Sequence, residues 1–324
     1  VAPSRGLGDV YKRQHMYKIG KYYYLMAAEG GTEYGHMITY ARSESVWGKF
    51  EGYPHNPVLT NRNKAPFIIQ GIGHGDLIQD KNGEWHIICL GFRQIHMWMT
   101  YHHLGRECFL IPVTFHEDGW FTAGNGTCEE SYELSGDFAQ LPLKTYTLEN
   151  IGHDICHLRH PHTENYSITK DKITLKGTDV TLDDVASPTF AGVRQRDFDM
   201  DCSVSVSVSD GEGGLTVYSC ETEHYDLALR KNEGGYEAIL RLNIGGIRHT
   251  EKAVQISSGS AKLIIRSDSQ VYKFFVQSQG EEIPMGFAMS KYLSSEVCGG
   301  FTGTVIGMYA VKGSAEFTDL RISY

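Results

Sequence analysis

Residues 202–220 read CSVSVSVSDGEGGLTVYSC and decide the fold class. Serine and valine alternate strictly over residues 203–208, which is the period of a β-strand with one buried face and one solvent-exposed face. Residues 210–214, rich in Gly with one Asp, provide turn chemistry and lead into a second apolar run at residues 215–220. The stretch therefore predicts two antiparallel strands joined by a turn.

The same pattern, short apolar or alternating runs separated by Gly, Asp and Asn, extends over the whole chain. Helical periodicity is nearly absent. In the first third, the predicted strands lie at residues 21–28, 36–42, 75–79, 85–92 and 107–115. In the second half they lie at residues 166–175, 202–208, 215–220, 225–230, 236–244, 261–267, 271–277, 303–311 and 317–324. So many antiparallel strands predict an all-β chain that ends in a two-sheet sandwich.

Length, composition and charge exclude several classes of protein. The 324 residues, 41% of them hydrophobic, are enough for two buried cores. The net charge of -9 is spread along the chain without a cluster of Lys and Arg, so nucleic acid is not an expected partner. The chain has no apolar stretch of bilayer-spanning length and no signal-peptide order in residues 1–30, so no membrane partner is expected and a cytoplasmic location is favoured over secretion. The seven cysteines lie mostly in apolar runs, which indicates buried free thiols.

Ordered motifs carry more information than the strand pattern. The first part of the chain contains YYYLMAAEGGTEYGHMITYARS at residues 22–43, GHGDL at 73–77, NGEW at 82–85 and HHLGRECFLIPV at 102–113. The second part contains LRHP at residues 158–161, NYS at 165–167, ASPTF at 186–190 and GGFTG at 299–303. In content and order, these motifs resemble glycoside hydrolase family 43, and those of the second part are similar to the C-terminal sandwich of its β-xylosidase branch. The resemblance covers roughly residues 15–324.

The resemblance implies a five-bladed β-propeller whose axial pocket holds the sugar, followed by a concanavalin-like β-sandwich that closes one side of that pocket. We expect the C-terminal part of the propeller at residues 15–123, a connecting segment at residues 124–160 and the sandwich at residues 161–324. Residues 1–14 match nothing in the family, and we expect them to be a non-native leader. The predicted fold class is thus all-β, a partial propeller followed by a sandwich.

The resemblance also implies the reaction of the family. Its members invert the anomeric configuration with an Asp that activates water and a Glu that protonates the leaving oxygen, and these two groups stand about 6.5–9.5 Å apart. The acid of relatives stands just before the position of His15, where this chain has Lys12, Arg13 and Gln14. We therefore expect an inactive, N-terminally truncated piece of an exo-β-xylosidase that acts on xylo-oligosaccharides, with no catalytic carboxylate. Asp9 lacks the family context of a base.

Two other functions stay open. An α-L-arabinofuranosidase of the same family fits the motifs equally well, so the expected partners are xylose- or arabinose-containing oligosaccharides. A non-catalytic carbohydrate-binding role for the sandwich is the second alternative, although no row of exposed aromatic residues at sheet spacing supports it. A homo-oligomer is also left open.

Four residues correspond to sugar contacts of the family. Arg106 matches an arginine that reaches the xylose hydroxyls, and its rigid fork of donors suits paired oxygens, whereas an ion pair with Glu107 is the structural alternative. His74 matches a histidine near the propeller axis, or has a structural role. Phe301 matches an aromatic residue on a sandwich loop above the pocket, with core packing as the alternative. Thr32, which closes a Glu-Gly-Gly-Thr turn, is the fourth and least supported pocket residue.

The reaction requires no cofactor. In some relatives the histidine at the position of His74 also helps to hold a divalent cation, so a Ca²⁺ ion near His74 is the cofactor considered. Five side chains able to bind metal also crowd the connecting segment, namely His153, Cys156, His157, His160 and His162. Their spacing fits no standard zinc site, so no metal is predicted in that segment.

Overall fold

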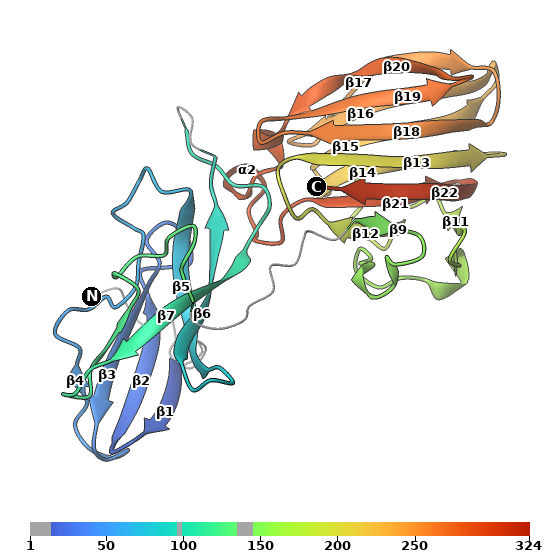
Figure 1. Cartoon of the computed structure of the whole chain (residues 1–324). Coiled ribbons are helices and arrows are strands. Elements are labelled where there is room, and N and C mark those ends of the chain that lie inside the picture. Colours follow the sequence, from blue (N-terminus) through green and yellow to red (C-terminus); the bar gives the residue numbers. More distant parts are fainter. Residues whose placement is uncertain (1–13, 96–98, 135–144) are drawn as a thin grey trace. The chain divides into compact units, whose positions relative to one another are not determined.

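The computed structural model describes residues 14–95, 99–134 and 145–324 (Figure 1). Strands dominate this part of the chain, and its helical elements span three or four residues each. The all-β class predicted from the sequence is confirmed. The leader expected at residues 1–14 lies outside the described residues except for Gln14.

The chain divides into two compact units. The first unit comprises residues 1–100 and 106–140, and the second comprises residues 101–105 and 141–324. The short segment at residues 101–105 packs with the second unit because Thr304 N donates a hydrogen bond to His103 O at 2.8 Å. The domain boundaries drawn from the sequence stay predictions.

The first unit contains two antiparallel sheets of four strands each. The strands of the first sheet follow in chain order as β1 (Gln14–Ile19), β2 (Tyr22–Glu29), β3 (Met37–Ser43) and β4 (Glu51–Gly52). Those of the second sheet are β5 (Ile69–Gln79), β6 (Trp85–Arg93), β7 (Glu107–Phe115) and β8 (Phe121–Ala123). Four-stranded antiparallel sheets of this kind are the repeating unit of a β-propeller.

An aromatic core joins the two sheets of the first unit. The Tyr40 ring stacks on Phe121 with 3.9 Å between ring centroids. The Tyr40 hydroxyl donates to Phe121 O at 2.7 Å and accepts from Phe121 N at 2.8 Å. Tyr24 donates to Gly119 O at 2.5 Å in the same layer. Because these buried hydroxyls are hydrogen-bonded, the cost of removing them from water is largely offset, and tyrosine can fill this core.

The second unit is a sandwich of two antiparallel sheets. The first sheet has the order β10-β11-β22-β13-β18-β19-β20, with β9 paired to β22, and the second has the order β12-β21-β14-β15-β16-β17. The strands of the first sheet are β9 (Tyr146–Thr147), β10 (Tyr166–Ile168), β11 (Ile173–Gly177), β13 (Met200–Val208), β18 (Ser260–Ser267), β19 (Val271–Ser278), β20 (Glu281–Met289) and β22 (Gly313–Ser323). The strands of the second sheet are β12 (Thr189–Arg194), β14 (Glu212–Cys220), β15 (Glu223–Asn232), β16 (Gly235–Ile244), β17 (Ile247–Ile256) and β21 (Val305–Val311).

The main core of the second unit lies between its sheets. Cys202, Val204, Val206 and Val208 of β13 are all at most 3% exposed and belong to this core. The strict Ser/Val alternation therefore predicted the buried face of β13 correctly, because successive side chains of a strand point to opposite faces.

The structure corrects several of the strands predicted for the sandwich. Strand β14 begins at Glu212, so the turn predicted at residues 210–214 is shorter than expected. The single strand predicted at residues 166–175 is a hairpin of β10 and β11, in which Thr169 N bonds Lys172 O across the turn. Strands β12, β17 and β20 were not predicted, and most side chains of β17 are exposed and show no apolar alternation.

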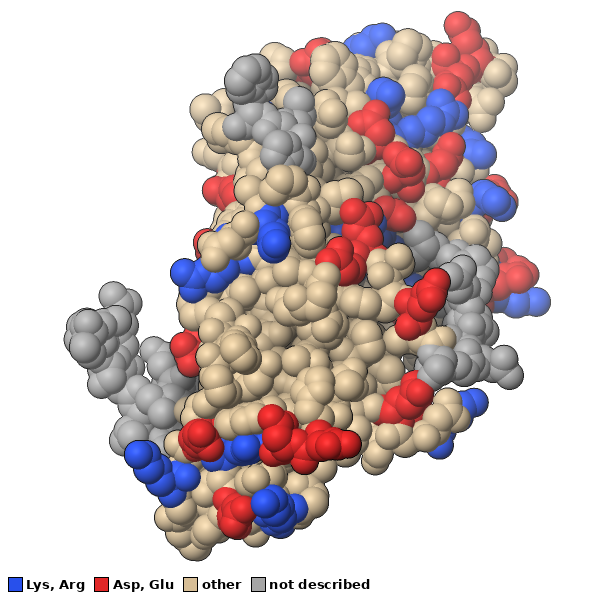
Figure 2. All heavy atoms as spheres, turned by 60° about the vertical axis from the view of Figure 1, so that its left-hand side comes forward, with Lys and Arg blue, Asp and Glu red and all other residues tan. Residues whose placement is uncertain are grey.

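The surface fits the even charge distribution of the sequence. On the face shown in Figure 2, acidic and basic side chains are interspersed, and neither sign gathers into a broad patch. Among the described residues, no helix has the length and hydrophobicity that crossing a membrane requires.

Candidate functional site

Strand β5 carries the predicted sugar contact His74 in a distorted segment. The pairing of β5 with β6 shifts register between Gln70 and Gly73 and again between Gly73 and Asp76. Such irregularities re-aim side chains and are frequent next to functional sites. His74 itself has φ +50°, a left-handed conformation that is uncommon for a residue with a β-carbon. The backbone therefore holds the imidazole in a direction that a regular strand does not allow.

The glycines on both sides of His74 are required by close packing. A β-carbon on Gly73 would lie 2.4 Å from ring atoms of His36, and one on Gly75 would lie 2.6 Å from Ile38 Cδ1. Both neighbours are buried side chains. The two glycines thus allow β5 to pack closely against the neighbouring sheet, and the His74 imidazole lies between them in sequence.

Three side chains to which the sequence analysis assigned no role form a cluster that contacts His74 through His15. The His15 ring meets the His74 ring edge-on, with 6.0 Å between centroids. Asp76 contacts His15 Nδ1 and accepts a hydrogen bond from the Tyr17 hydroxyl at 3.0 Å. Burial raises the pKa of Tyr17 to about 12, so its phenol stays a neutral donor. The available signal was the period of two in β1, which places residues 15 and 17 on one face of that strand.

Arg106 and Thr32 were both predicted from the sequence, and the structure brings them together. Arg106 Nη2 donates to Thr32 O at 2.9 Å and is also hydrogen-bonded to the Thr32 hydroxyl. Glu107, the carboxylate considered as the structural alternative, is bound by Arg93 through Nε at 2.9 Å and Nη2 at 3.0 Å. The Thr32 turn thus orients the guanidinium that the family resemblance assigns to sugar binding, while Arg93 compensates the charge of Glu107.

Phe301 belongs to the second unit, in the loop that follows α2 (Ser295–Cys298). Gly299 and Gly300 precede it with φ +70° and +75°, and both conformations favour glycine. Phe301 is partly exposed, in contrast to Phe274, which is fully buried in the sandwich core. This exposure argues against the core-packing alternative for Phe301.

The Ca²⁺ ion expected near His74 can be compared with the groups of possible metal ligands among the described residues. Groups of three or more His, Cys, Asp or Glu ligand atoms occur in this part of the chain at Asp80, Glu84 and His86 and at Cys220, Glu223 and Cys298. His74 belongs to neither group, and a Ca²⁺ ion near His74 stays a prediction, since Ca²⁺ also binds carbonyl oxygens and water. In the connecting segment, His157 Nδ1 lies 2.8 Å from Phe190 O, and Cys156 donates to Gly192 O at 3.2 Å, so both side chains have contacts within the sandwich unit.

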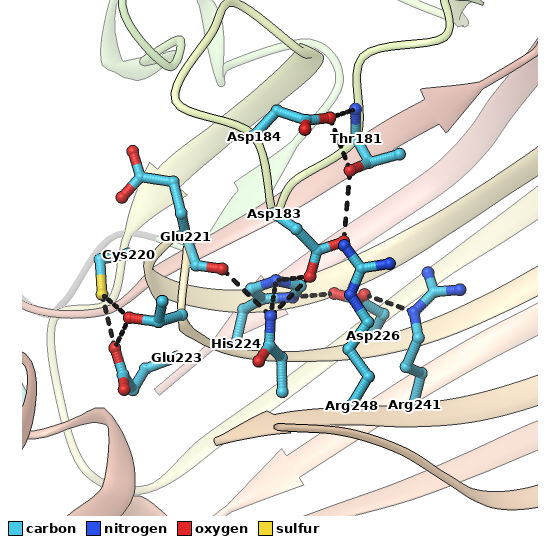
Figure 3. Close-up of polar contacts among 12 residues, drawn as sticks. Thr181, Asp183, Asp184, Cys220, Glu221, Glu223, His224, Asp226, Arg241 and Arg248 are labelled. Atoms are coloured by element: carbon cyan, nitrogen blue, oxygen red, sulfur yellow. Dashed lines mark hydrogen bonds and ion pairs between the residues drawn. The ribbon is translucent and has the colours of Figure 1, made fainter. Parts of the chain in front are cut away.

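A second polar cluster lies in the sandwich, around His224 of β15 (Figure 3). His224 is 1% exposed, and its two ring nitrogens lie 2.9 Å from Asp226 Oδ1 and 3.2 Å from Asp183 Oδ1. Burial disfavours the imidazolium, but the two carboxylates outweigh it and raise the pKa of His224 to about 9. Burial likewise opposes the charge of Asp226, yet the positive charges of His224 and Arg241 lower its pKa to about 2.

Arginines complete this cluster. Arg241 Nε lies 3.1 Å from Asp226 Oδ2, and Arg248 forms an ion pair with Asp183. Each of the two carboxylates beside His224 therefore also has a guanidinium partner. In this buried network each charged group has a partner of opposite charge. The network holds Asp183, in the loop between β11 and β12, against β15 and β16, and we assign it a structural role.

Comparisons with known proteins place the chain in a family. Residues 9–121 match the model of glycosyl hydrolases family 43, and residues 144–321 match the model of the β-xylosidase C-terminal concanavalin A-like domain. The chain belongs to glycoside hydrolase family 43. It is 38% identical over 309 residues to the non-reducing end α-L-arabinofuranosidase BoGH43B of Bacteroides ovatus, an alignment that covers 91% of the chain and 58% of that protein. It is 28% identical over 314 residues to a xylosidase/arabinosidase of Butyrivibrio fibrisolvens, covering 91% of the chain and 60% of the relative.

Solved structures of the family have the same fold. The Bacteroides ovatus xyloglucan-locus family 43 protein B aligns with TM-score 0.85 at 36% identity, over 95% of this chain and 64% of that one. A xylan β-1,4-xylosidase from Bacillus halodurans aligns with TM-score 0.86 at 26% identity, over 96% of this chain and 64% of that one. The predicted propeller-like and concanavalin-like folds are confirmed. The chain spans about three-fifths of the length of these relatives.

Proposed function

We propose that this family 43 protein is an exo-acting pentosidase, with the β-xylosides of xylo-oligosaccharides as its first candidate substrates and α-L-arabinofuranosides as the second. The observation that carries the proposal is the Arg106 guanidinium, which the Thr32 turn orients within the motif that the family uses for sugar binding. A planar fork of N–H donors suits the paired hydroxyl oxygens of a pentose.

Each candidate substrate has its own support. The match to the β-xylosidase C-terminal domain over residues 144–321 favours xylosides. The 38% identity to an arabinofuranosidase over most of the chain favours arabinofuranosides. His74 and Asp76 of the first unit offer further polar groups for a sugar, and the family resemblance assigns Phe301 of the second unit to an apolar wall.

We further propose that residues 1–324 alone do not turn over glycosides. Inversion requires an acid at the leaving oxygen and a base on the opposite face of the ring. The family motifs found in this chain correspond to proposed sugar contacts. None of them contains a residue that matches the acid or the base of the family. The chain would then contribute part of the binding pocket, and a sequence that carries the acid and the base would be needed for turnover.

The test compares two proteins on aryl β-xyloside and aryl α-L-arabinofuranoside. One is the chain with its present sequence, and the other carries the N-terminal half of a relative in place of residues 1–14. We expect turnover by the second protein alone, and the ratio of kcat/KM on the two substrates identifies the activity. Turnover by the unmodified chain that disappears when one of its own carboxylates is mutated would refute the proposed inactivity. No turnover of either pentoside by the joined, folded protein would refute the pentosidase assignment.

A further inference from the structure

Two cysteines and a glutamate meet at one end of the sandwich, and none of them is among the predicted sugar contacts. Cys220 is the last residue of β14, Glu223 is the first residue of β15, and the two are paired in the sheet register. Cys298 is the last residue of α2. One sulfur or carboxylate oxygen from each residue lies within 4.8 Å of the other two. Possible metal-ligand atoms from β14, β15 and α2 therefore lie close together.

These side chains are in close contact, and no positively charged group takes part in the contacts recorded for the described residues. Cys220 Sγ lies 2.7 Å from Glu223 Oε2, as Figure 3 shows, and Cys298 Sγ lies within 4.8 Å of Cys220 Sγ and of a Glu223 carboxylate oxygen. Cys298 Sγ also lies 3.4 Å from the carbonyl oxygen of Tyr292. Sulfur and oxygen atoms thus crowd a small volume.

Glu223 provides an independent reason to expect a cation. Its side chain is buried, with 4% of the residue exposed. Its oxygens accept hydrogen bonds from Gly245 N at 3.0 Å and from the Thr222 hydroxyl. Throughout the described parts of the chain, no Lys, Arg or His side chain forms an ion pair with Glu223. A buried carboxylate is costly unless a positive charge compensates it, and the nearby carboxylates of Asp183 and Asp226 both have such partners.

The ligand set selects the kind of ion. Thiolate sulfur favours Zn²⁺ over Ca²⁺ and Mg²⁺, which prefer oxygen alone. With Zn–S near 2.3 Å and Zn–O near 2.0–2.2 Å, neighbouring ligand atoms of a tetrahedral site lie about 3.6–3.8 Å apart. The three ligand atoms lie within 4.8 Å of one another, and the 2.7 Å between Cys220 Sγ and Glu223 Oε2 is shorter than this value, so coordination requires side-chain rotations that move these two atoms apart.

We propose that Cys220, Glu223 and Cys298 form a Zn²⁺ site whose fourth position is taken by water. On binding, each thiol exchanges its S–H proton for a bond to zinc, and the protons leave to solvent. The two thiolates and the carboxylate together carry three negative charges. With Zn²⁺ bound, the site therefore has one net negative charge. The ion would tie the β14–β15 hairpin to the end of α2, three residues before Phe301. This site is independent of the proposed pentosidase activity.

The direct test measures metal binding by the full chain. The protein is purified under reducing conditions with a chelator, and is then titrated with Zn²⁺ against a chromophoric competitor and separately with Co²⁺. We expect one Zn²⁺ per chain and, with Co²⁺, the near-ultraviolet charge-transfer band of a cobalt–thiolate bond. Cys220→Ser and Cys298→Ser should each weaken zinc binding by at least about 100-fold, and Glu223→Gln should weaken it less.

Two control variants separate zinc binding by this cluster from zinc binding elsewhere on the chain. Cys108→Ser removes an exposed thiol outside the cluster and should leave the affinity unchanged. Asp80→Asn disrupts the other group of potential ligands, formed by Asp80, Glu84 and His86, and should also leave it unchanged. The cobalt spectrum of the unmodified chain needs no variant, so the proposal stays testable even if a cysteine variant fails to fold.

Three results would overturn the assignment. One is the absence of stoichiometric zinc binding or of a cobalt–thiolate band in the reduced wild-type chain. Another is a zinc ion that persists in a folded Cys220→Ser/Cys298→Ser double variant and is lost with Asp80→Asn. The last is a reduced-and-refolded chain that, even with zinc present, has an intact mass lower by two hydrogen atoms and a peptide that links Cys220 to Cys298 by a disulfide.

Discussion

The buried ion cluster around His224 should make the stability of the sandwich depend on pH. The pKa of His224 rises from 6.5 to about 9 in the folded chain because Asp226 and Asp183 outweigh the cost of burial. A group whose folded pKa is raised contributes stability that is fully present below its unfolded pKa and is lost as the pH rises through its folded pKa. The window for His224 is therefore pH 6.5 to about 9.

The size of this effect follows from the same pKa values. At 1.36 kcal/mol for each pH unit, the rise from 6.5 to about 9 corresponds to about 3 kcal/mol of unfolding free energy. His224 is 1% exposed, so solvent screening reduces this value little. We expect the sandwich to lose most of this free energy between about pH 6 and pH 9.5.

The assay can distinguish the two units. All four tryptophans lie within residues 47–120, so tryptophan fluorescence in urea reports the first unit alone. Hydrogen exchange of amides in β14, β15 and β16, corrected for intrinsic rates, reports the sandwich. The matched variant is His224→Gln, which removes the titrating group while Asp226 keeps Arg241 and Asp183 keeps Arg248.

The expected result is a loss of about 3 kcal/mol in the wild-type sandwich and a clearly smaller loss in His224→Gln. If the folded variant and the wild type lose equal free energy over this pH range, the reasoning about the cluster is wrong. Direct titration of His224 with a pKa below its unfolded value would contradict it as well.

Other predictions concern packing and sugar binding. Phe274→Ala should lower the unfolding free energy of the sandwich by about 3–5 kcal/mol, whereas Phe287→Ala, at a residue 65% exposed, should change it by about 0.5 kcal/mol or less in urea unfolding. Gly75→Ala should destabilise the first unit by about 1–3 kcal/mol, because the new methyl group would meet Ile38; an unchanged urea midpoint in tryptophan fluorescence would contradict the packing argument. In the joined enzyme, Arg106→Ala should cost about 1.5–3 kcal/mol in transition-state binding, measured as kcat/KM, and Arg106→Lys should recover little of it. A folded Arg106→Ala variant with parental efficiency would rule out sugar binding by this residue.

Local patterns determined the fold class and the family. Strand period and turn residues act over a few neighbouring positions, so the alternation in β13 and the turn after Asp80 could be interpreted without knowledge of the remaining chain. The motifs that place the chain in family 43 are also short and continuous. They led to Arg106, His74, Phe301 and Thr32 as candidate sugar contacts, and these roles stay predictions.

The tertiary structure decided which distant residues meet. Thr32 orients Arg106 across 74 positions of sequence, Asp76 binds His15 and Tyr17 from another sheet, and Cys298 reaches Cys220 and Glu223 from a one-turn helix. A strand pattern specifies which face a side chain occupies, but the partner across that face depends on how the sheets pack. The same reason explains why β17 was missed: its hydrogen bonds to β16 form it, while its exposed side chains show no buried face in the sequence.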